Sequence, residues 1–123
     1  MQTTADMQAR ALFDQATPNA QGFRDVTPAA VAALRDAHIV DVRQPTEFND
    51  QLGHIPGAVL VPLATLAGAA RTWDPAAPLV VVCRSGGRSS NAAAQLAAAG
   101  FTRVMNMAGG MLAYRAEGLP VAP

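Results

Sequence analysis

The sequence predicts an α/β domain in which a mainly parallel sheet is flanked by helices. Short β-branched runs alternate along the chain with Ala-rich segments, the pattern of a parallel sheet with helical crossovers. The strongest run, Leu79–Val82, is continuously apolar, as expected of a central strand that is covered on both faces. A length of 123 residues suits one domain, and a hydrophobic content of 50% supplies a sizeable core.

The first 22 residues are polar and Ala-rich, so we expect an N-terminal extension over 1–22 and the domain proper over 23–123. Met7, Ala11, Leu12 and Gln15 approximate the stripe of a short helix, which we expect over 6–15. A mobile arm is the alternative for this segment.

The domain opens with a predicted strand and a capped helix. Phe23–Val26 is the strand. Thr27 then serves as a helix N-cap with Pro28 at the first helical position, and we expect the helix to end near Asp36.

Two further strand–helix pairs follow in the first half of the domain. His38–Val42 is a short β-branched run suited to a buried strand, and Thr46–Leu52 is a candidate helix. After the Pro56-Gly57 turn, Val59–Val61 and Leu63–Ala70 are the next predicted strand and helix.

The second half begins with the central strand and continues with a glycine-containing loop and an Ala-rich helix. The helix is expected over Ser90–Ala99, with Ser89 as a good N-cap residue and Gly100 as the stop. The last predicted elements are a strand over Arg103–Met107 and a short helix that begins at Gly109-Gly110 and ends near Glu117.

The composition excludes several classes of protein. The nine basic residues are all Arg and are balanced by nine acidic residues, so a nucleic-acid partner is not expected. A single cysteine, Cys83, forms neither an internal disulfide nor a cysteine-rich zinc site. We see no secretory signal and no apolar stretch of membrane-spanning length, which makes a reducing, cytoplasmic setting without membrane association the default.

The candidate site is the segment in which Cys83 ends the central strand and a Gly-Gly pair precedes a helix. Ligands of open α/β sheets bind beyond the carboxyl ends of the strands. Successive N–H groups of such a loop form a nest for anions, and the helix N-terminus adds partial positive charge. The positive potential of these N–H groups lowers the pKa of a nearby thiol, and the side chains of Arg84 and Arg88 add full positive charges. These features predict a cysteine nucleophile for an anionic electrophile; the alternative is a buried cysteine that only fills space.

Three ordered segments resemble the rhodanese-type sulfurtransferases. They are Asp41–Phe48 with Gly53–Ala58, the loop Cys83–Ser89, and Gly109–Tyr114 with Gly118–Val121. The resemblance implies a five-stranded, mainly parallel sheet and a reaction in which Cys83 takes the outer sulfur of thiosulfate or a related anionic donor as a persulfide. Cyanide, a small thiol or a protein thiol then accepts the sulfur, with no metal or organic cofactor. The residues expected to hold donor and persulfide are Arg84, Ser85, Gly86, Gly87, Arg88 and Ser89.

Asp41 and Arg43 have two interpretations, because they follow another strand and should lie beside the loop. Arg43 could help to bind an anion. The alternative, which we favour, is an ion pair, with Glu47 as a further partner, that holds the strand and the following loop together.

Two other functions share parts of this pattern. Cysteine-dependent phosphatases and arsenate reductases also use a Cys, an anion nest and an Arg that follows the nest. Their loops resemble the pattern Cys-x5-Arg, with five residues between Cys and Arg, whereas four residues separate Cys83 from Arg88. A persulfide carrier that delivers sulfur to a partner protein is the other alternative. Because the sequence has one Cys, any persulfide must be discharged to an outside thiol or nucleophile.

Overall fold

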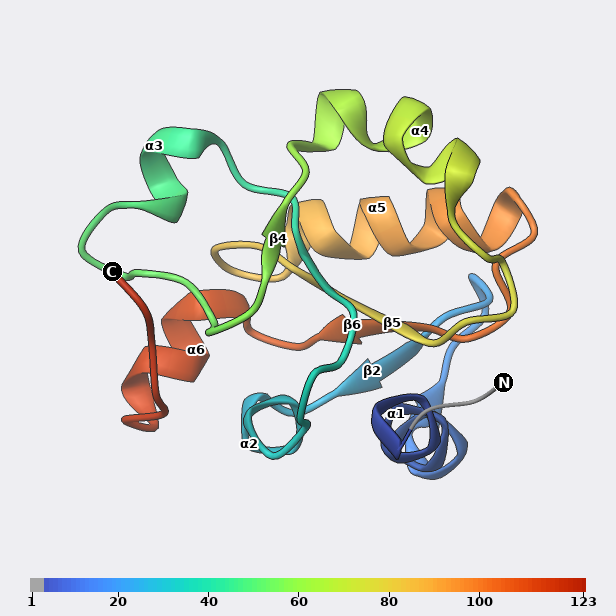
Figure 1. Ribbon diagram of the computed structural model, residues 1–123, viewed down its shortest axis with the longest axis horizontal. Helices are drawn as coiled ribbons and strands as arrows, with labels where there is room; N and C mark the ends of the chain where they lie inside the picture. Colours follow the sequence, from blue (N-terminus) through green and yellow to red (C-terminus); the bar gives the residue numbers. More distant parts are fainter. Residues whose placement is uncertain (1–3) are drawn as a thin grey trace.

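The computed structural model describes residues 4–123, and its centre is a six-stranded sheet with the order β1-β2-β6-β5-β3-β4 (Figure 1). The strands are β1 (Thr17–Pro18), β2 (Arg24–Val26), β3 (Ile39–Asp41), β4 (Val59–Leu60), β5 (Leu79–Val82) and β6 (Val104–Met107). Among these six strands, β1 and β2 pair antiparallel and all other neighbours pair in parallel. The predicted class of fold is therefore confirmed.

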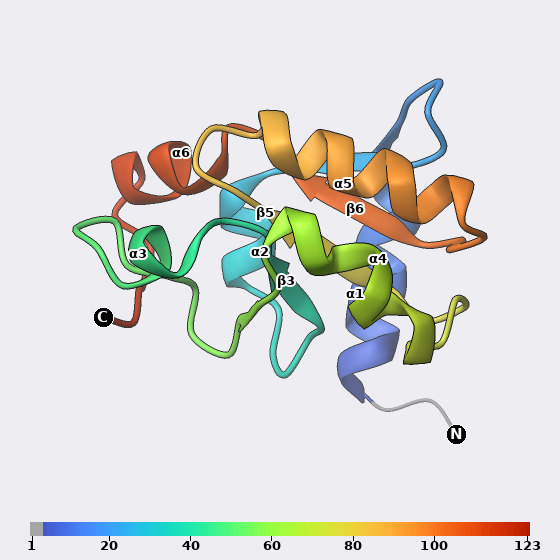
Figure 2. The same cartoon turned by 90° about the horizontal axis from the view of Figure 1, so that it is seen from above.

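Helices cover both faces of the sheet (Figures 1 and 2). The helices are α1 (Thr4–Gln15), α2 (Pro28–Ala32), α3 (Pro45–Phe48), α4 (Leu66–Ala69), α5 (Gly87–Ala98) and α6 (Gly110–Ala116), with 3-10 turns η1 (Leu63–Thr65) and η2 (Ala70–Thr72). One apolar cluster lies between the sheet and α4 and α5, and a second lies under α1, α2 and α6.

The central strand β5 contributes side chains to both apolar clusters, as its continuous apolar sequence predicts. Leu79 and Val81 face α5, whereas Val80 and Val82 face the opposite layer. Because the alternation continues past the strand, Cys83 lies on the same side of the sheet as α5. The pattern that identified the strand therefore also decides into which layer the cysteine points.

The sixth strand arises from the N-terminal segment, which packs on the domain. Ala9 of α1 is 2% exposed. The Arg24 guanidinium donates to the carbonyl of Phe13 at the end of α1 and lies 4.3 Å from the centre of the Phe13 ring. This anchoring brings Thr17–Pro18 beside β2, where it adds the antiparallel edge strand that the sequence analysis did not predict.

Two helices end earlier than predicted. Thr27 caps α2 as expected, because its hydroxyl oxygen accepts a hydrogen bond from the N–H of Ala30 at 3.2 Å. However, α2 ends at Ala32, and Asp36, with φ +54°, has left-handed backbone that cannot continue a helix. Helix α3 likewise stops at Phe48. The predicted helix over 63–70 is a short α-helical turn between two 3-10 turns.

Candidate active site

Three parallel strands deliver the candidate residues to one edge of the sheet. Cys83 directly follows β5, Asp41 ends β3, and Gly109 lies just beyond β6. Since β5 pairs with both β3 and β6 in parallel, these carboxyl ends lie next to one another. Open parallel sheets bind their ligands at the carboxyl ends of their strands.

Helix α5 begins inside the loop, which corrects the prediction of a start at Ser90 with Ser89 as N-cap. The first helical residue is Gly87, and the N-cap is Gly86, whose φ of +104° needs a glycine. The sharp turn at Gly86 starts the helix three residues earlier than the Ala-rich pattern indicated. The N–H groups of the first helical turn consequently lie beside the cysteine rather than beyond the loop.

The loop is held from behind by the start of α6. The N–H groups of Met111 and Leu112 donate to the carbonyls of Cys83 and Arg84 at 2.8 and 2.9 Å. These two carbonyls therefore point toward α6. Gly110 makes the close approach possible, because a Cβ there would lie 2.5 Å from the carbonyl of Arg84. The sequence showed the Gly109-Gly110 pair but not its contact with the loop.

The Cys83 sulfur lies at the base of the loop, and the residue is only 1% exposed. The Gly86 N–H donates to Sγ at 3.1 Å. Burial raises the pKa of the Cys83 thiol, but hydrogen bonds from the Ser89 hydroxyl and from the N–H groups of Ser89, Gly86 and Ser85 outweigh it. The net result is a pKa below the ordinary value, which favours the thiolate.

Arg88 on α5 forms an ion pair with Glu47 of α3. The two guanidinium nitrogens donate to the two carboxylate oxygens at 2.6 and 2.7 Å. The hydrogen bond with Arg88 is the main cause that lowers the pKa of Glu47 to about 2. In this arrangement, the positive charge of Arg88 beside the loop is already balanced by an internal carboxylate.

The remaining residues of the predicted loop form its outer rim. Arg84, Ser85 and Gly87 are exposed. Within residues 4–123, Arg84 has no ion-pair partner. The loop thus combines a buried sulfur, N–H groups that point to it and one unbalanced cation at its mouth.

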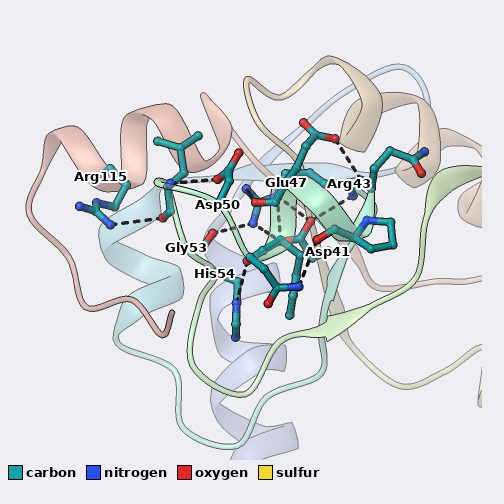
Figure 3. Close-up of polar contacts among 12 residues, drawn as sticks. Asp41, Arg43, Glu47, Asp50, Gly53, His54 and Arg115 are labelled. Carbon is teal, nitrogen blue, oxygen red and sulfur yellow. Dashed lines mark hydrogen bonds and ion pairs between the residues drawn. The ribbon is translucent and has the colours of Figure 1, made fainter.

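Asp41 and Arg43 form a fully buried ion pair (Figure 3), with 2.8 Å between Nη2 and Oδ2. Arg43 also donates to the carbonyls of Glu47 and Gly53 at 3.2 and 2.7 Å. Its guanidinium is thus engaged with protein oxygens that tie β3 to the segment 47–53. This is the arrangement expected of the structural interpretation, and it leaves Arg43 no exposed surface for an anion.

A buried polar network behind Ser89 was missed by the sequence analysis. Ser89 is fully buried, and its hydroxyl lies 2.6 Å from Oδ1 of Asn106 on β6. The Asn106 amide donates to Asp25 on β2 at 3.0 Å and to Ser90 at 3.2 Å. One signal was present in the sequence: Asn106 is the single polar residue of the strand Val104–Met107.

A cavity of about 530 Å³ lies near the amino ends of β3 and β4, between α2 and α6, and contains none of the loop residues. Within residues 4–123, no group of three His, Cys, Asp or Glu side chains could hold a metal ion. No helix in that range is long and apolar enough to cross a membrane.

Fold and loop together define an α/β protein whose one cysteine lies in a glycine-containing turn at the carboxyl ends of the central strands, with a backbone N–H directed at its sulfur. The chain belongs to the rhodanese-like domain family, whose profile matches residues 27–117. It is 35% identical over 91 residues to a protein of Allochromatium vinosum named sulfurtransferase, covering 74% of this chain and 83% of that protein. It is 39% identical over 95 residues to the thiosulfate sulfurtransferase GlpE of Pseudomonas syringae, covering 76% and 88%.

Solved structures show the same fold. A rhodanese-like domain protein from Staphylococcus aureus superposes with a TM-score of 0.67 at 29% identity, covering 80% of this chain and 98% of that one. A protein of unknown function from Rhodopseudomonas palustris, described as a possible tyrosine phosphatase, superposes with a TM-score of 0.75 at 27% identity, covering 99% of both chains. The second likeness extends over the N-terminal segment as well as the family domain.

Proposed function

We propose that this protein is a sulfurtransferase that moves a sulfane sulfur from thiosulfate or a related donor to cyanide or a thiol through a persulfide on Cys83. The observation that carries the proposal is the Cys83 sulfur itself, with the Gly86 N–H at 3.1 Å and a lowered thiol pKa. Membership of the rhodanese-like family and the names of the relatives support sulfur transfer in general. The identity of donor and acceptor is the finer part of the proposal.

In the first half-reaction, the Cys83 thiolate attacks the outer sulfur of thiosulfate. A new S–S bond forms to Sγ, and the S–S bond within thiosulfate breaks with its electron pair leaving on sulfite. The product is an anionic Cys83 persulfide, so charge and electrons balance without a further oxidant. The N–H groups that now face Sγ are suited to stabilise negative charge on the added sulfur.

In the second half-reaction, cyanide or a thiolate attacks the outer persulfide sulfur. The electron pair of the broken S–S bond returns to Cys83 as thiolate, and thiocyanate or an acceptor persulfide leaves. Cys83 is the sole cysteine of the sequence. No second thiol within these 123 residues can take the sulfur, which is equally consistent with an enzyme and with a carrier that serves a partner protein.

The two loop arginines have different parts in this proposal. Arg84 is exposed and meets the sulfite end of the donor. Arg88 is held by Glu47 and contributes less net charge to donor binding. Arg84→Ala should therefore raise KM for thiosulfate more than Arg88→Ala does. Arg35→Ala is the matched control for lost charge, because Arg35 is exposed on the α2–β3 connection away from the loop.

The decisive experiment incubates the purified protein with thiosulfate and measures intact mass. We expect the gain of one sulfur atom, its removal by cyanide with release of thiocyanate, and neither event in Cys83→Ser. A persulfide that forms but passes only to a protein thiol would favour the carrier. Hydrolysis of an aryl phosphate without any sulfur gain would overturn the proposal in favour of a phosphatase, the activity suggested for the Rhodopseudomonas palustris neighbour.

A further inference from the structure

The carboxylate of Glu47 lies beside the cysteine loop and is fixed there by three sets of contacts. Arg88, in the first turn of α5, donates from its two guanidinium nitrogens to the two carboxylate oxygens at 2.6 and 2.7 Å. The Gln44 N–H donates to Oε1 of the same carboxylate at 3.0 Å. The buried Arg43 donates to the main-chain carbonyl of Glu47 at 3.2 Å (Figure 3). The position of this negative charge is therefore set by its own helix, by α5 and by the buried ion pair after β3.

The pair of Glu47 and Arg88 is partly open to solvent and close to the sulfur. The side chains of Arg88 and Glu47 are 37% and 22% exposed. Figures 1 and 2 both show α3 beside the loop that leads into α5. The hydrogen bond with Glu47 is the main cause that raises the pKa of Arg88, and the charge of Cys83 is a smaller one. An anion that reaches Cys83 is therefore within the electric field of both members of the pair.

The charges of the loop and its two neighbouring ion pairs cancel once Cys83 is ionised. The buried ion pair after β3 is neutral as a unit, and Glu47 neutralises Arg88. Arg84 has no ion-pair partner among residues 4–123, and the charge of the thiolate is equal and opposite to its own. The site consequently presents an incoming donor with N–H groups for the transferred sulfur but with little net positive charge.

We propose that Glu47 is a specificity-determining residue that, by cancelling the charge of Arg88, restrains the use of doubly charged sulfur donors relative to singly charged ones. Thiosulfate belongs to the first class, and thiosulfonates and small-molecule persulfides belong to the second. Coulomb energies are proportional to the charge of the ion, so a charge near the site changes the binding free energy of a dianion twice as much as that of a monoanion. The inference rests on the proposed function, because it assumes that Cys83 takes sulfur from an anionic donor.

Two donors that differ mainly in charge make this preference measurable. Thiosulfate carries two negative charges and leaves as sulfite. Methanethiosulfonate has a methyl group in place of one oxygen, carries one negative charge and leaves as methanesulfinate. In both reactions the Cys83 thiolate bonds to the outer sulfur, and the electron pair of the broken S–S bond goes to the leaving group. The same anionic Cys83 persulfide forms in each case without a further oxidant, so intact mass after rapid quenching follows both reactions without an acceptor.

The test compares the second-order rate constants of persulfide formation from the two donors at low ionic strength. Glu47→Gln keeps the shape of the side chain and an acceptor for the Gln44 N–H, but it removes the negative charge. We expect the rate constant to rise about threefold for methanethiosulfonate and about tenfold for thiosulfate, so that their ratio shifts about threefold toward thiosulfate. Glu117→Gln is the matched control. It removes the same charge from the exposed C-cap of α6, at the end away from the loop, and should leave the ratio unchanged.

Two further variants separate charge from shape. Glu47→Asp keeps the carboxylate on a shorter side chain and should retain the wild-type ratio. Arg88→Gln leaves Glu47 unbalanced and should shift the ratio about threefold toward methanethiosulfonate. An unchanged ratio in a folded Glu47→Gln protein would overturn the inference and leave the proposed function standing, as would a Glu47→Asp protein that behaves like Glu47→Gln. A wild-type protein that takes sulfur from neither donor would overturn both.

Discussion

Gly110 is the residue whose substitution most directly tests how α6 supports the cysteine loop. A Cβ at this position would lie 2.5 Å from the carbonyl carbon and oxygen of Arg84 and 2.6 Å from the carbonyl oxygen of Cys83. All three are backbone atoms, so no side-chain rotation can relieve the overlap. Gly110→Ala must therefore move either the loop or the start of α6.

The size of the displacement follows from ordinary contact distances. Non-bonded contact at a Cβ normally begins at 3.4 Å, so the backbone of Cys83 and Arg84 must retreat by about 0.9 Å. The φ of +59° adds about 1–2 kcal/mol of conformational cost for any L side chain. A misplacement near 1 Å at a reactive group lowers rates by about a hundredfold.

The assay compares Gly110→Ala with Gly118→Ala. Gly118 lies just past the other end of α6, has φ +70° and has open space around the added methyl group. It reproduces the conformational cost without the overlap. We expect both variants to lose about 1–2 kcal/mol in urea unfolding from conformational strain. Only Gly110→Ala should slow persulfide formation from thiosulfate and alkylation of Cys83 by about a hundredfold.

Two results would refute this reasoning. Wild-type rates in a folded Gly110→Ala protein would mean that the loop does not depend on its contact with α6. An equal loss of rate in Gly118→Ala would mean that strain in the helix, and not the overlap, controls the sulfur.

Three further predictions concern the surroundings of the site. Arg43→Met should cost about 3–5 kcal/mol in urea unfolding, because it leaves the Asp41 carboxylate buried without its partner; a stable protein would contradict the assignment. Glu47 has its pKa lowered from 4.5 to about 2, chiefly by Arg88, so its contribution is complete above pH 4.5 and is lost as pH falls toward 2. Because the pair is partly exposed, Glu47→Gln should cost at most about 1 kcal/mol at neutral pH and flatten the unfolding profile over that acid range. Tyr114→Phe removes a 2.6 Å hydrogen bond and should lower the free energy of unfolding by about 1 kcal/mol, with sulfur transfer unchanged.

The sequence was most informative where the determinants are local. The continuous apolar run before Cys83 identified the central strand, and its bounds Leu79–Val82 agree with the structure. The Thr27-Pro28 cap was equally readable, because capping involves residues three positions apart. The start of α5 was predicted three residues too late, because what fixes it is not local. Helix propensity marked the Ala-rich part, whereas the left-handed turn at Gly86 depends on the contacts that close the loop.

By itself, the sequence determined that one cysteine ends a buried parallel strand and is followed by two glycines and two arginines. Hydrophobic pattern and spacing along the chain are sufficient for that. Only the tertiary structure decided that Arg88 is balanced by Glu47, 41 residues away, and that the Ser89 hydroxyl faces Asn106, 17 residues away. The partner of a side chain across a sheet depends on strand order and register. Those are chosen by the packing of the whole chain, and no local pattern contains them.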